Sequence, residues 1–392
     1  MKKIKILNVL LPICFTFIAL LSCNDNDNDK IDEVVSNDLR VNFVSLAKAM
    51  EMSTKIDFSM CDITNSGMLK KGGINERVVK RINIIDDESG FPFYYLINFK
   101  DEGFVIISAD NRLIPILAFS DQDSFEVLPE KYPLGLTQWL NEIESEIRAV
   151  RKTNKKQDPK IKLVWDKFDF KTAPLPGDDD GDGEVDPCQD INTLIGPLLV
   201  TKWSQQGGYN DSIPVACSID DQAPVGCVAV AAAQVMKYYE YPNNYQWDDM
   251  PISSATGEIA KLMRDIGLSV NMNWSCTGSG ASTEDLPSTF TNDFGYTSAL
   301  YSNFNHVILT NELNNGRPVI LRGQGSEGGH AWVCDGYLRT NYCDSGASYL
   351  SLHMNWGWVN GMYNGYFAYN NWNPANGIDF NTNPHMITNI IP

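Results

Sequence analysis

Apolar residues in the first half of the chain fall into three short runs. The runs span residues 93–99, 104–109 and 114–119, and Gly103 and Asn111 separate them. Short apolar runs bounded by turn residues are typical of neighbouring strands joined by tight connections. The pattern therefore predicts an antiparallel meander.

Two amphipathic helices are predicted around this meander. The first follows the capping residues of segment 36–38, and its apolar positions are Leu39, Phe43, Leu46 and Met50. The second closes the unit with Leu136, Trp139, Leu140, Ile143 and Ile147 at helical spacing. We expect residues 36–155 to form a compact α+β domain without a catalytic set of its own.

The second half of the chain is helical first and strand-rich later. A run of strong helix formers begins at Cys227, and Pro242 ends it after about Glu240. A second helix is predicted from Ile259 to Ile266, closed by Gly267. The later apolar runs predict strands over 318–321, 331–335, 349–354 and 366–369.

An acidic, low-complexity segment joins the two halves. It runs from Thr172 to Pro187, and Asp178, Asp180, Asp182 and Gly183 match positions 1, 3, 5 and 6 of a calcium-binding loop. Position twelve is Gln189, where a bidentate Glu is expected. The mismatch favours an exposed linker over a calcium site, and exposed linkers are where proteolytic cleavage is easiest.

Length and charge narrow the classes of protein. A chain of 392 residues exceeds one ordinary core, so two domains with additional segments are expected. The formal charge of −18 argues against a nucleic-acid partner and against binding anionic membranes through basic patches.

The N-terminus has the pattern of an export signal. A basic segment, residues 1–5, precedes the apolar stretch 6–21, and Cys23 follows that stretch. We predict a lipoprotein signal peptide over 1–22 with Cys23 lipidated, the alternative being ordinary cleavage with Cys23 free. Residues 23–35 then form an acidic tether, which resembles the surface-export tags of some Bacteroides-group lipoproteins.

Six further cysteines permit disulfides in an exported protein. They are Cys61, Cys188, Cys217, Cys276, Cys334 and Cys343, which allow fifteen pairings and match no zinc pattern. We predict no pairing, and we interpret Cys334 as a packed core thiol.

Three residues form a candidate catalytic set. Cys227 follows Gly226 at a predicted helix start, where free N–H groups and the helix dipole favour a thiolate and lower the thiol pKa. His330 and Asn355 follow in the order nucleophile, base and orienting group. Each residue alone is better explained as structural, but the three together favour chemistry.

The residues around this set resemble the streptopain family of secreted bacterial cysteine peptidases. The segments that carry the resemblance are 226–242 around Cys227, Gly329-His330-Ala331 and Asn355-Trp356-Gly357-Trp358. Residues 103–121 are similar to the inhibitory pro-domain of that family, and residues 198–207 to the start of its mature enzyme. The resemblance implies a papain-like α+β fold, with a helical lobe and an antiparallel sheet lobe over 195–392.

The family resemblance also implies the chemistry. Cys227 attacks the peptide carbonyl, His330 transfers protons, Asn355 orients His330, and Trp356 shields the His–Asn pair from water. The second oxyanion donor is in doubt, because Arg322 stands at the family's spacing and Gln324 two positions later. No metal or organic cofactor is required, and an apolar side chain is expected just before the scissile residue.

The same resemblance implies a zymogen with defined partners. Residues 156–194 are expected to contain the activation cleavage, and the pro-domain is expected to inhibit its own enzyme. Other partners are protein or peptide substrates, with membrane contact only through the N-terminal lipid. We expect an outer-membrane or cell-surface location with release of the mature enzyme. The stretch 337–352 is longer than in the family, and we expect a larger loop near the site there.

Several alternatives remain open at this point. His306, His353 and His385 compete with His330 for the role of base. A surface adhesin or inhibitor-like binding protein on a peptidase scaffold is the alternative to an enzyme. Another Cys–His enzyme, such as a cell-wall amidase or a transglutaminase, is a third reading.

Overall fold

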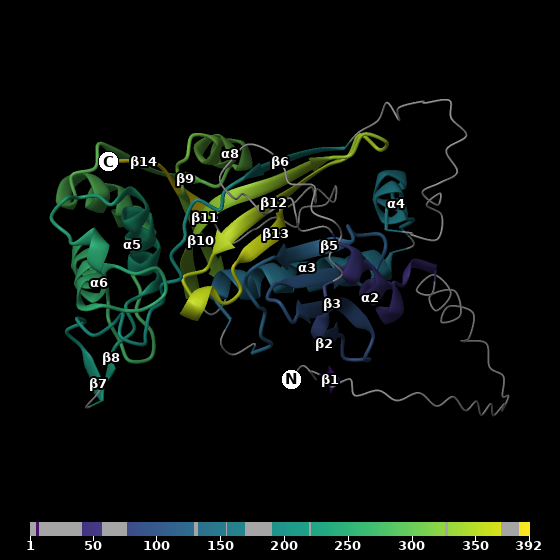
Figure 1. Cartoon of the computed structure of the whole chain (residues 1–392), viewed down its shortest axis with the longest axis horizontal. Helices are drawn as coiled ribbons and strands as arrows, with labels where there is room; N and C mark the ends of the chain where they lie inside the picture. Colours follow the sequence, from purple (N-terminus) through teal and green to yellow (C-terminus); the bar gives the residue numbers. More distant parts are fainter. Residues whose placement is uncertain are drawn as a thin grey trace. The chain divides into compact units, whose positions relative to one another are not determined.

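The computed structural model describes the chain in two compact units (Figure 1). The described residues are 5–7, 41–56, 77–128, 132–153, 155–168, 190–218, 221–325, 328–369 and 384–392. Unit 1 comprises residues 1–117, 143–189 and 342–347, and unit 2 comprises 118–142, 190–341 and 348–392. Cys23, Cys61, Cys188 and the predicted calcium residues Asp178, Asp180 and Asp182 lie outside the described residues.

Unit 1 contains the predicted meander. Its strands pair antiparallel in the order β1-β2-β3-β4. The elements that contribute to it are β1 (Lys5–Leu7), α2 (Leu46–Lys55), β2 (Val79–Asp86), β3 (Pro92–Phe99), β4 (Phe104–Ser108), the start of β5 (Ile116–Ser120), the end of α3 (Leu134–Lys152) and α4 (Pro159–Asp166). The predictions for β3, β4 and β5 are confirmed to within about two residues, and α3 is confirmed but extends five residues beyond Ile147. The strand β2 was not predicted, because polar residues interrupt its apolar pattern.

The first predicted helix is interrupted near its middle. Phe43 forms a β-bridge with Asp110. The helix α2 begins at Leu46, and the Ser45 side chain caps it by accepting a hydrogen bond from Lys48 N at 3.2 Å. The prediction of one continuous helix over 39–50 is therefore wrong, because strand pairing takes over the residues before Ser45.

Unit 1 is also held by buried charges within the pro-domain-like segment. Asp110 accepts two hydrogen bonds from the Arg112 guanidinium, at 2.8 and 2.7 Å, and a longer contact from Arg151 at 3.4 Å. Because these groups are buried, removal of one partner would leave an uncompensated charge. This explains why Asp110 and Arg112 stand in an otherwise apolar segment.

Part of the predicted linker is folded. Residues 159–166 form α4, which Asp158 caps through Lys160 N at 2.8 Å. Trp165 is buried, and its Nε1 donates to Leu113 O at 2.7 Å. The beginning of segment 156–194 is therefore a packed helix of unit 1.

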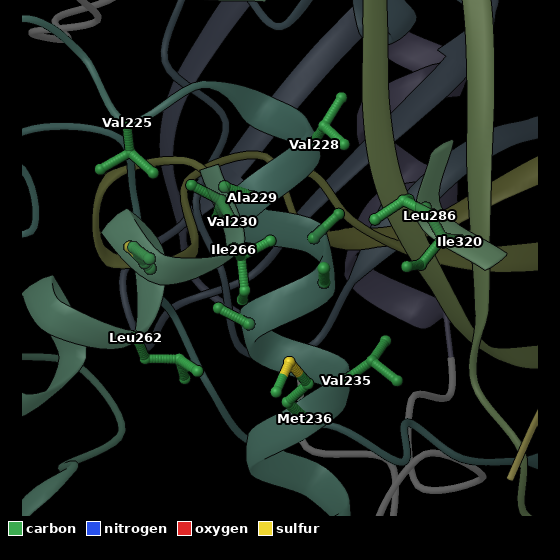
Figure 2. Packing of buried hydrophobic residues seen from close by; sticks show 14 of the residues in the cluster. Val225, Val228, Ala229, Val230, Val235, Met236, Leu262, Ile266, Leu286 and Ile320 are labelled. Atoms are coloured by element: carbon green, nitrogen blue, oxygen red, sulfur yellow. The ribbon is translucent and has the colours of Figure 1, made fainter. Parts of the chain in front are cut away.

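Unit 2 begins with an apolar helix surrounded by other elements. Nine consecutive residues of α5 (Cys227–Tyr239) are buried, from Val228 to Met236. Figure 2 shows α5 side chains packed with Leu262 and Ile266 of α6 (Gly257–Ser269) and with Leu286 and Ile320. The helix α6 continues past Gly267, so the predicted stop there is wrong. Unit 2 also contains α7 (Leu286–Ser288), α8 (His306–Asn314) and the beginning of α3.

The sheet of unit 2 packs beside α5 (Figure 1). Its strands follow the order β13-β12-β11-β10-β14-β9, with β6 paired to the far end of β11 and residues 118–119 of β5 paired to β13. The bounds are β6 (Ile191–Ile195), β9 (Ser298–Asn303), β10 (Val319–Gly325), β11 (Gly328–Asn341), β12 (Ser348–Asn355), β13 (Gly365–Tyr369) and β14 (His385–Ile391), and a separate hairpin joins β7 (Ala216–Ser218) to β8 (Asp221–Gln222).

Two expectations about this sheet need correction. The stretch 337–352 is mostly paired strand, because Asn341 of β11 pairs with Ser348 of β12, so the predicted large loop is a hairpin. His385 begins the strand β14, which is missing from the strands predicted from the sequence. Within the described ranges, no helix has the length and apolar character needed to cross a bilayer.

A buried acid–histidine pair, Asp335 and His353, contacts the chain near the beginning of segment 190–341 of unit 2. Asp335 Oδ1 lies 2.6 Å from His353 Nδ1, and its Oδ2 accepts from Leu199 N at 2.9 Å. The carbonyl of Asp335 accepts from Leu198 N, also at 2.9 Å. Burial acts to lower the pKa of His353, but the charge and hydrogen bond of Asp335 outweigh burial and raise that pKa above its ordinary value.

We predict that this pair makes unit 2 less stable as pH rises. A raised folded pKa means that the stabilisation is complete below the unfolded value of about 6.5 and is lost as pH rises through the folded value. His353→Gln should therefore cost about 3 kcal/mol of unfolding free energy near pH 5.5 and clearly less near pH 9. Urea unfolding at both pH values measures it, with the exposed His306→Gln as control. A cost for His353→Gln that is the same at both pH values would contradict the prediction.

Candidate active site

The Cys227 thiol stands at the first position of α5. Gly226 before it has φ 97°, a conformation that side chains rarely adopt, and a Cβ there would lie 2.6 Å from Met272 Sδ. Val225 N donates to Gln205 O at 3.0 Å, which fixes the turn that leads into the helix. A glycine is therefore required immediately before the cysteine.

The backbone of β11 approaches this thiol. Ala331 N donates to Cys227 Sγ at 3.4 Å. Since the Cα of His330 is two bonds from that nitrogen, it lies within about 6 Å of the sulfur. The structure thus brings Cys227 close to the backbone of His330, although Cys227 and Ala331 lie 104 positions apart in the sequence.

The His330 ring itself contacts a different group. Its Nε2 lies 3.3 Å from the carbonyl oxygen of Trp356. Among the hydrogen bonds of the described residues, none joins the His330 ring to Cys227 or to Asn355.

Burial disfavours the charged form of both titratable groups. Burial raises the pKa of the Cys227 thiol, although N–H groups of Ala331, Val228 and Cys227 itself act in the opposite direction. Burial lowers the pKa of His330 to about 4, against a raising effect of the Trp356 carbonyl. The expectation of a lowered thiol pKa is wrong for this state, because desolvation outweighs the helix N-terminus.

Asn355 is held by groups other than His330. Its Nδ2 donates to Thr201 O at 2.8 Å, and its Oδ1 accepts from Gln234 Nε2 at 3.1 Å and from Gly357 N at 3.2 Å. The predicted hydrogen bond to the imidazole is absent from the described contacts. The Asn355 amide instead forms hydrogen bonds with two backbone groups and with Gln234 of α5.

Aromatic rings surround the His330 imidazole. Trp332 stacks near it, with ring centroids 5.9 Å apart, and Trp358 meets it edge-on at 6.0 Å. Trp356 is buried and packs against Trp332 at 5.1 Å. No role was predicted for Trp332 from the sequence, although the period-two alternation of a strand puts it on the same face as His330.

The first residues of α3, which belong to unit 2, cover this aromatic group. A Cβ on Gly135 would lie 2.7 Å from Trp332 and 2.8 Å from Trp356. Trp139 donates from Nε1 to Ala368 O at 3.2 Å on β13. A segment that resembles the inhibitory pro-domain therefore packs directly on the indoles beside His330.

The remaining candidate residues lie in several different parts of unit 2. Gln324 pairs with Gly329 in the β10–β11 register, one residue from His330, but its side chain is not described. His306 lies beside Tyr369, His385 stacks on Tyr301, and His353 is bound to Asp335. Of the four histidines, His330 is the one that lies next to the Cys227 contact.

The cysteines of the described residues are divided between disulfides and thiols. Cys217 and Cys276 form a disulfide, Cys343 is also disulfide-bonded, and Cys227 and Cys334 are free. Cys334 is fully buried, as expected for a packed core thiol. The Cys217–Cys276 bond joins the β7–β8 hairpin to the segment that contacts Gly226 through Met272.

Comparisons with known proteins agree with this arrangement. The sequence profile of the peptidase C10 family matches residues 203–367, and that of the Spi protease inhibitor matches residues 64–147. Streptopain of Streptococcus pyogenes is 26% identical over 377 residues, covering 81% of this chain and 84% of its own length. The thiol protease/hemagglutinin PrtT of Porphyromonas gingivalis is 27% identical over 322 residues, covering 70% of this chain. The chain spans only 33% of the length of PrtT.

A solved structure shares the fold. The prointerpain A fragment of Prevotella intermedia matches with a TM-score of 0.56 and 23% identity, covering 81% of this chain and 99% of that one. At this level of identity the similarity shows a shared fold.

Proposed function

Because the chain belongs to the peptidase C10 family, we propose that it is a cysteine endopeptidase made as a zymogen, with Cys227 as nucleophile and His330 as general acid and base. The observation that carries the assignment is the contact of Ala331 N with Cys227 Sγ at 3.4 Å. It brings the backbone of His330 to the thiol at a helix start. Protein or peptide substrates follow from this chemistry.

The proposed reaction is an acyl transfer in two stages. The Cys227 thiolate attacks the scissile carbonyl, and the His330 imidazolium protonates the leaving amine. Water then attacks the thioester with His330 as base and frees the carboxylate. Asn355 is proposed to orient His330 and Trp356 to shield it. In the zymogen, however, the Trp356 carbonyl is the partner of the imidazole.

The developing oxyanion needs two donors. The backbone N–H of Cys227 is one of them, and Gln324 is the candidate that the sequence offers for the second. Gln205 is a further candidate, since its carbonyl accepts from Val225 N two residues before Cys227.

Alanine substitutions distinguish these two candidates. The variant of the true donor should lose on the order of 10²–10³-fold in kcat, with KM little changed, because the donor acts on the transition state. The other alanine variant serves as the control in a peptide hydrolysis assay. If neither variant loses kcat, the second donor is a different group.

Inhibition by the chain's own pro-domain is part of the proposal. The close approach of Gly135 to Trp332 and Trp356 supports it, because Trp332 stacks near His330 and Trp356 packs against Trp332. The pKa shifts of Cys227 and His330 also support latency, since they disfavour the reactive thiolate–imidazolium pair. Cleavage within 156–194 would then separate the pro-domain, and the segment after α4 is the candidate region.

We predict that Cys227→Ala abolishes both processing and hydrolysis. The full chain with Cys227 should shorten under mild reductant and then digest casein, whereas Cys227→Ala should stay full-length and lose at least about 10³-fold in activity. Gel analysis over time together with casein hydrolysis measures both. If the intact protein digests no casein even after an added protease cuts the linker, a binding protein on a peptidase scaffold becomes the better explanation.

We also infer that the protein is exported and anchored by a lipid on Cys23. The basic start, the apolar stretch 6–21 and Cys23 support this reading. The wild-type chain expressed in a bacterial host should partition into detergent, and Cys23→Ser should not. Equal partitioning of the two would rule out the anchor.

A further inference from the structure

A buried amide on α5 has no role in the chemistry described so far. Gln234 is fully buried in the apolar stretch of α5 and lies seven residues after Cys227. Residues seven apart share one helix face, about 10 Å apart along the axis. Burying an amide is unfavourable unless its polar atoms are hydrogen-bonded, so its partners explain its presence.

All of these partners belong to two other segments of unit 2. Gln234 Oε1 accepts from Thr201 Oγ1 at 3.0 Å and from Trp203 N at 3.4 Å, and its Nε2 donates to Asn355 Oδ1 at 3.1 Å. Asn355 Nδ2 in turn donates a hydrogen bond to Thr201 O at 2.8 Å. Thr201, Gln234 and Asn355 therefore form a closed ring of hydrogen bonds, which we call the amide ring.

Backbone groups fix the orientation of both amides in this ring. Trp203 N and Gly357 N can only donate, so the atoms that they meet on Gln234 and Asn355 must be the oxygens. The carbonyl of Thr201 can only accept, which identifies Nδ2 of Asn355. Neither side chain can flip without breaking a hydrogen bond to the backbone.

The amide ring holds the loop that carries the partner of His330. Asn355 is followed by Trp356, whose carbonyl lies 3.3 Å from His330 Nε2. Gly357 then passes close over α5, where a Cβ would lie 3.0 Å from Val230 and 3.9 Å from Gln234 Nε2. The position of the Trp356 carbonyl is thus tied to the helix that begins with Cys227.

We propose that Gln234 is a positioning residue of the peptidase: through Asn355 it fixes the Asn355–Gly357 loop, and hence the imidazole of His330, relative to Cys227. This inference rests on the proposed function. It explains why an amide interrupts the apolar face of α5 at a site two turns from the nucleophile. It also gives Asn355 a role that does not require a direct bond to His330.

Loss of this tether should change the pH profile as well as the rate. An acceptor for the imidazolium N–H raises the pKa of His330, so a displaced carbonyl would lower it. In a thiolate–imidazolium pair the alkaline limb of activity follows deprotonation of the histidine. The alkaline limb of kcat/KM should therefore move to lower pH.

The test uses the full chain carrying Gln234→Met, cleaved in the linker by an added protease. Methionine keeps the approximate volume and removes every hydrogen bond of the amide. We expect kcat to fall on the order of 10- to 100-fold with KM changed less than about threefold, and the alkaline limb to move down. Thr310→Val, which removes the buried side-chain hydrogen bond to Val307 O in α8, is the control and should leave both unchanged.

A second variant covers the case in which Gln234→Met does not fold. Gln234→Glu keeps an oxygen for Thr201 and Trp203 and replaces only the donor to Asn355. It should show the same loss of kcat and the same downward shift of the alkaline limb. Wild-type kcat and pH limits in the folded Gln234 variants would overturn the inference.

Alkylation separates this inference from the proposed function. The rate at which iodoacetamide modifies Cys227 reports the thiolate and requires no peptide hydrolysis. If the wild-type protein cleaves no peptide, the proposed function fails, and the pH dependence of alkylation still tests the inference. A profile in Gln234→Met identical to that of the wild type would overturn it, and a shifted profile would support it.

Discussion

The burial of helix α5 is the constraint on which the rest of unit 2 depends. Its residues from Val228 to Met236 are all buried, so no face of this helix can be left to water. Ile320 of the sheet, Leu286, and Leu262 and Ile266 of α6 all pack in the cluster around it (Figure 2). Because the helix is enclosed, its first residue, Cys227, meets the backbone of β11 at Ala331. The hydrophobic effect thus brings together a thiol and a histidine strand that are far apart in sequence.

Burial raises the pKa of the Cys227 thiol and lowers that of the His330 imidazole, so it disfavours the charged form of both groups. The imidazole has a backbone carbonyl as partner, and indoles flank it. Residues of α3, around Gly135, fill the space against these indoles. A zymogen needs such an arrangement, because a preformed thiolate–imidazolium pair would react with any peptide that reached it.

Buried hydrogen bonds supply the precision that apolar packing does not. Packing around α5 would tolerate small shifts of the Asn355–Gly357 loop, because apolar contacts have no fixed direction. The amide ring removes that freedom, since Gln234 and Asn355 are both oriented by backbone groups. The pair of Asp335 and His353 does the same for the chain where it enters unit 2. Both networks connect segments that approach the site from different parts of the sequence.

The sequence by itself determined the local elements and the chemical class. Helical spacing predicted α3 and α5, apolar runs predicted β3 and β4, and the order Cys227, His330, Asn355 indicated a cysteine peptidase. These signals are local, because period, turn residues and motif order are read within short windows. The strand β2 was missed because polar residues interrupt its apolar pattern, and β9 and β14 were missed because they are defined by pairing with strands distant in sequence. Only the tertiary structure decided the hydrogen-bond partners: Gln234 and Asn355 are 121 residues apart, and the thiol pKa depends on burial that no local pattern records.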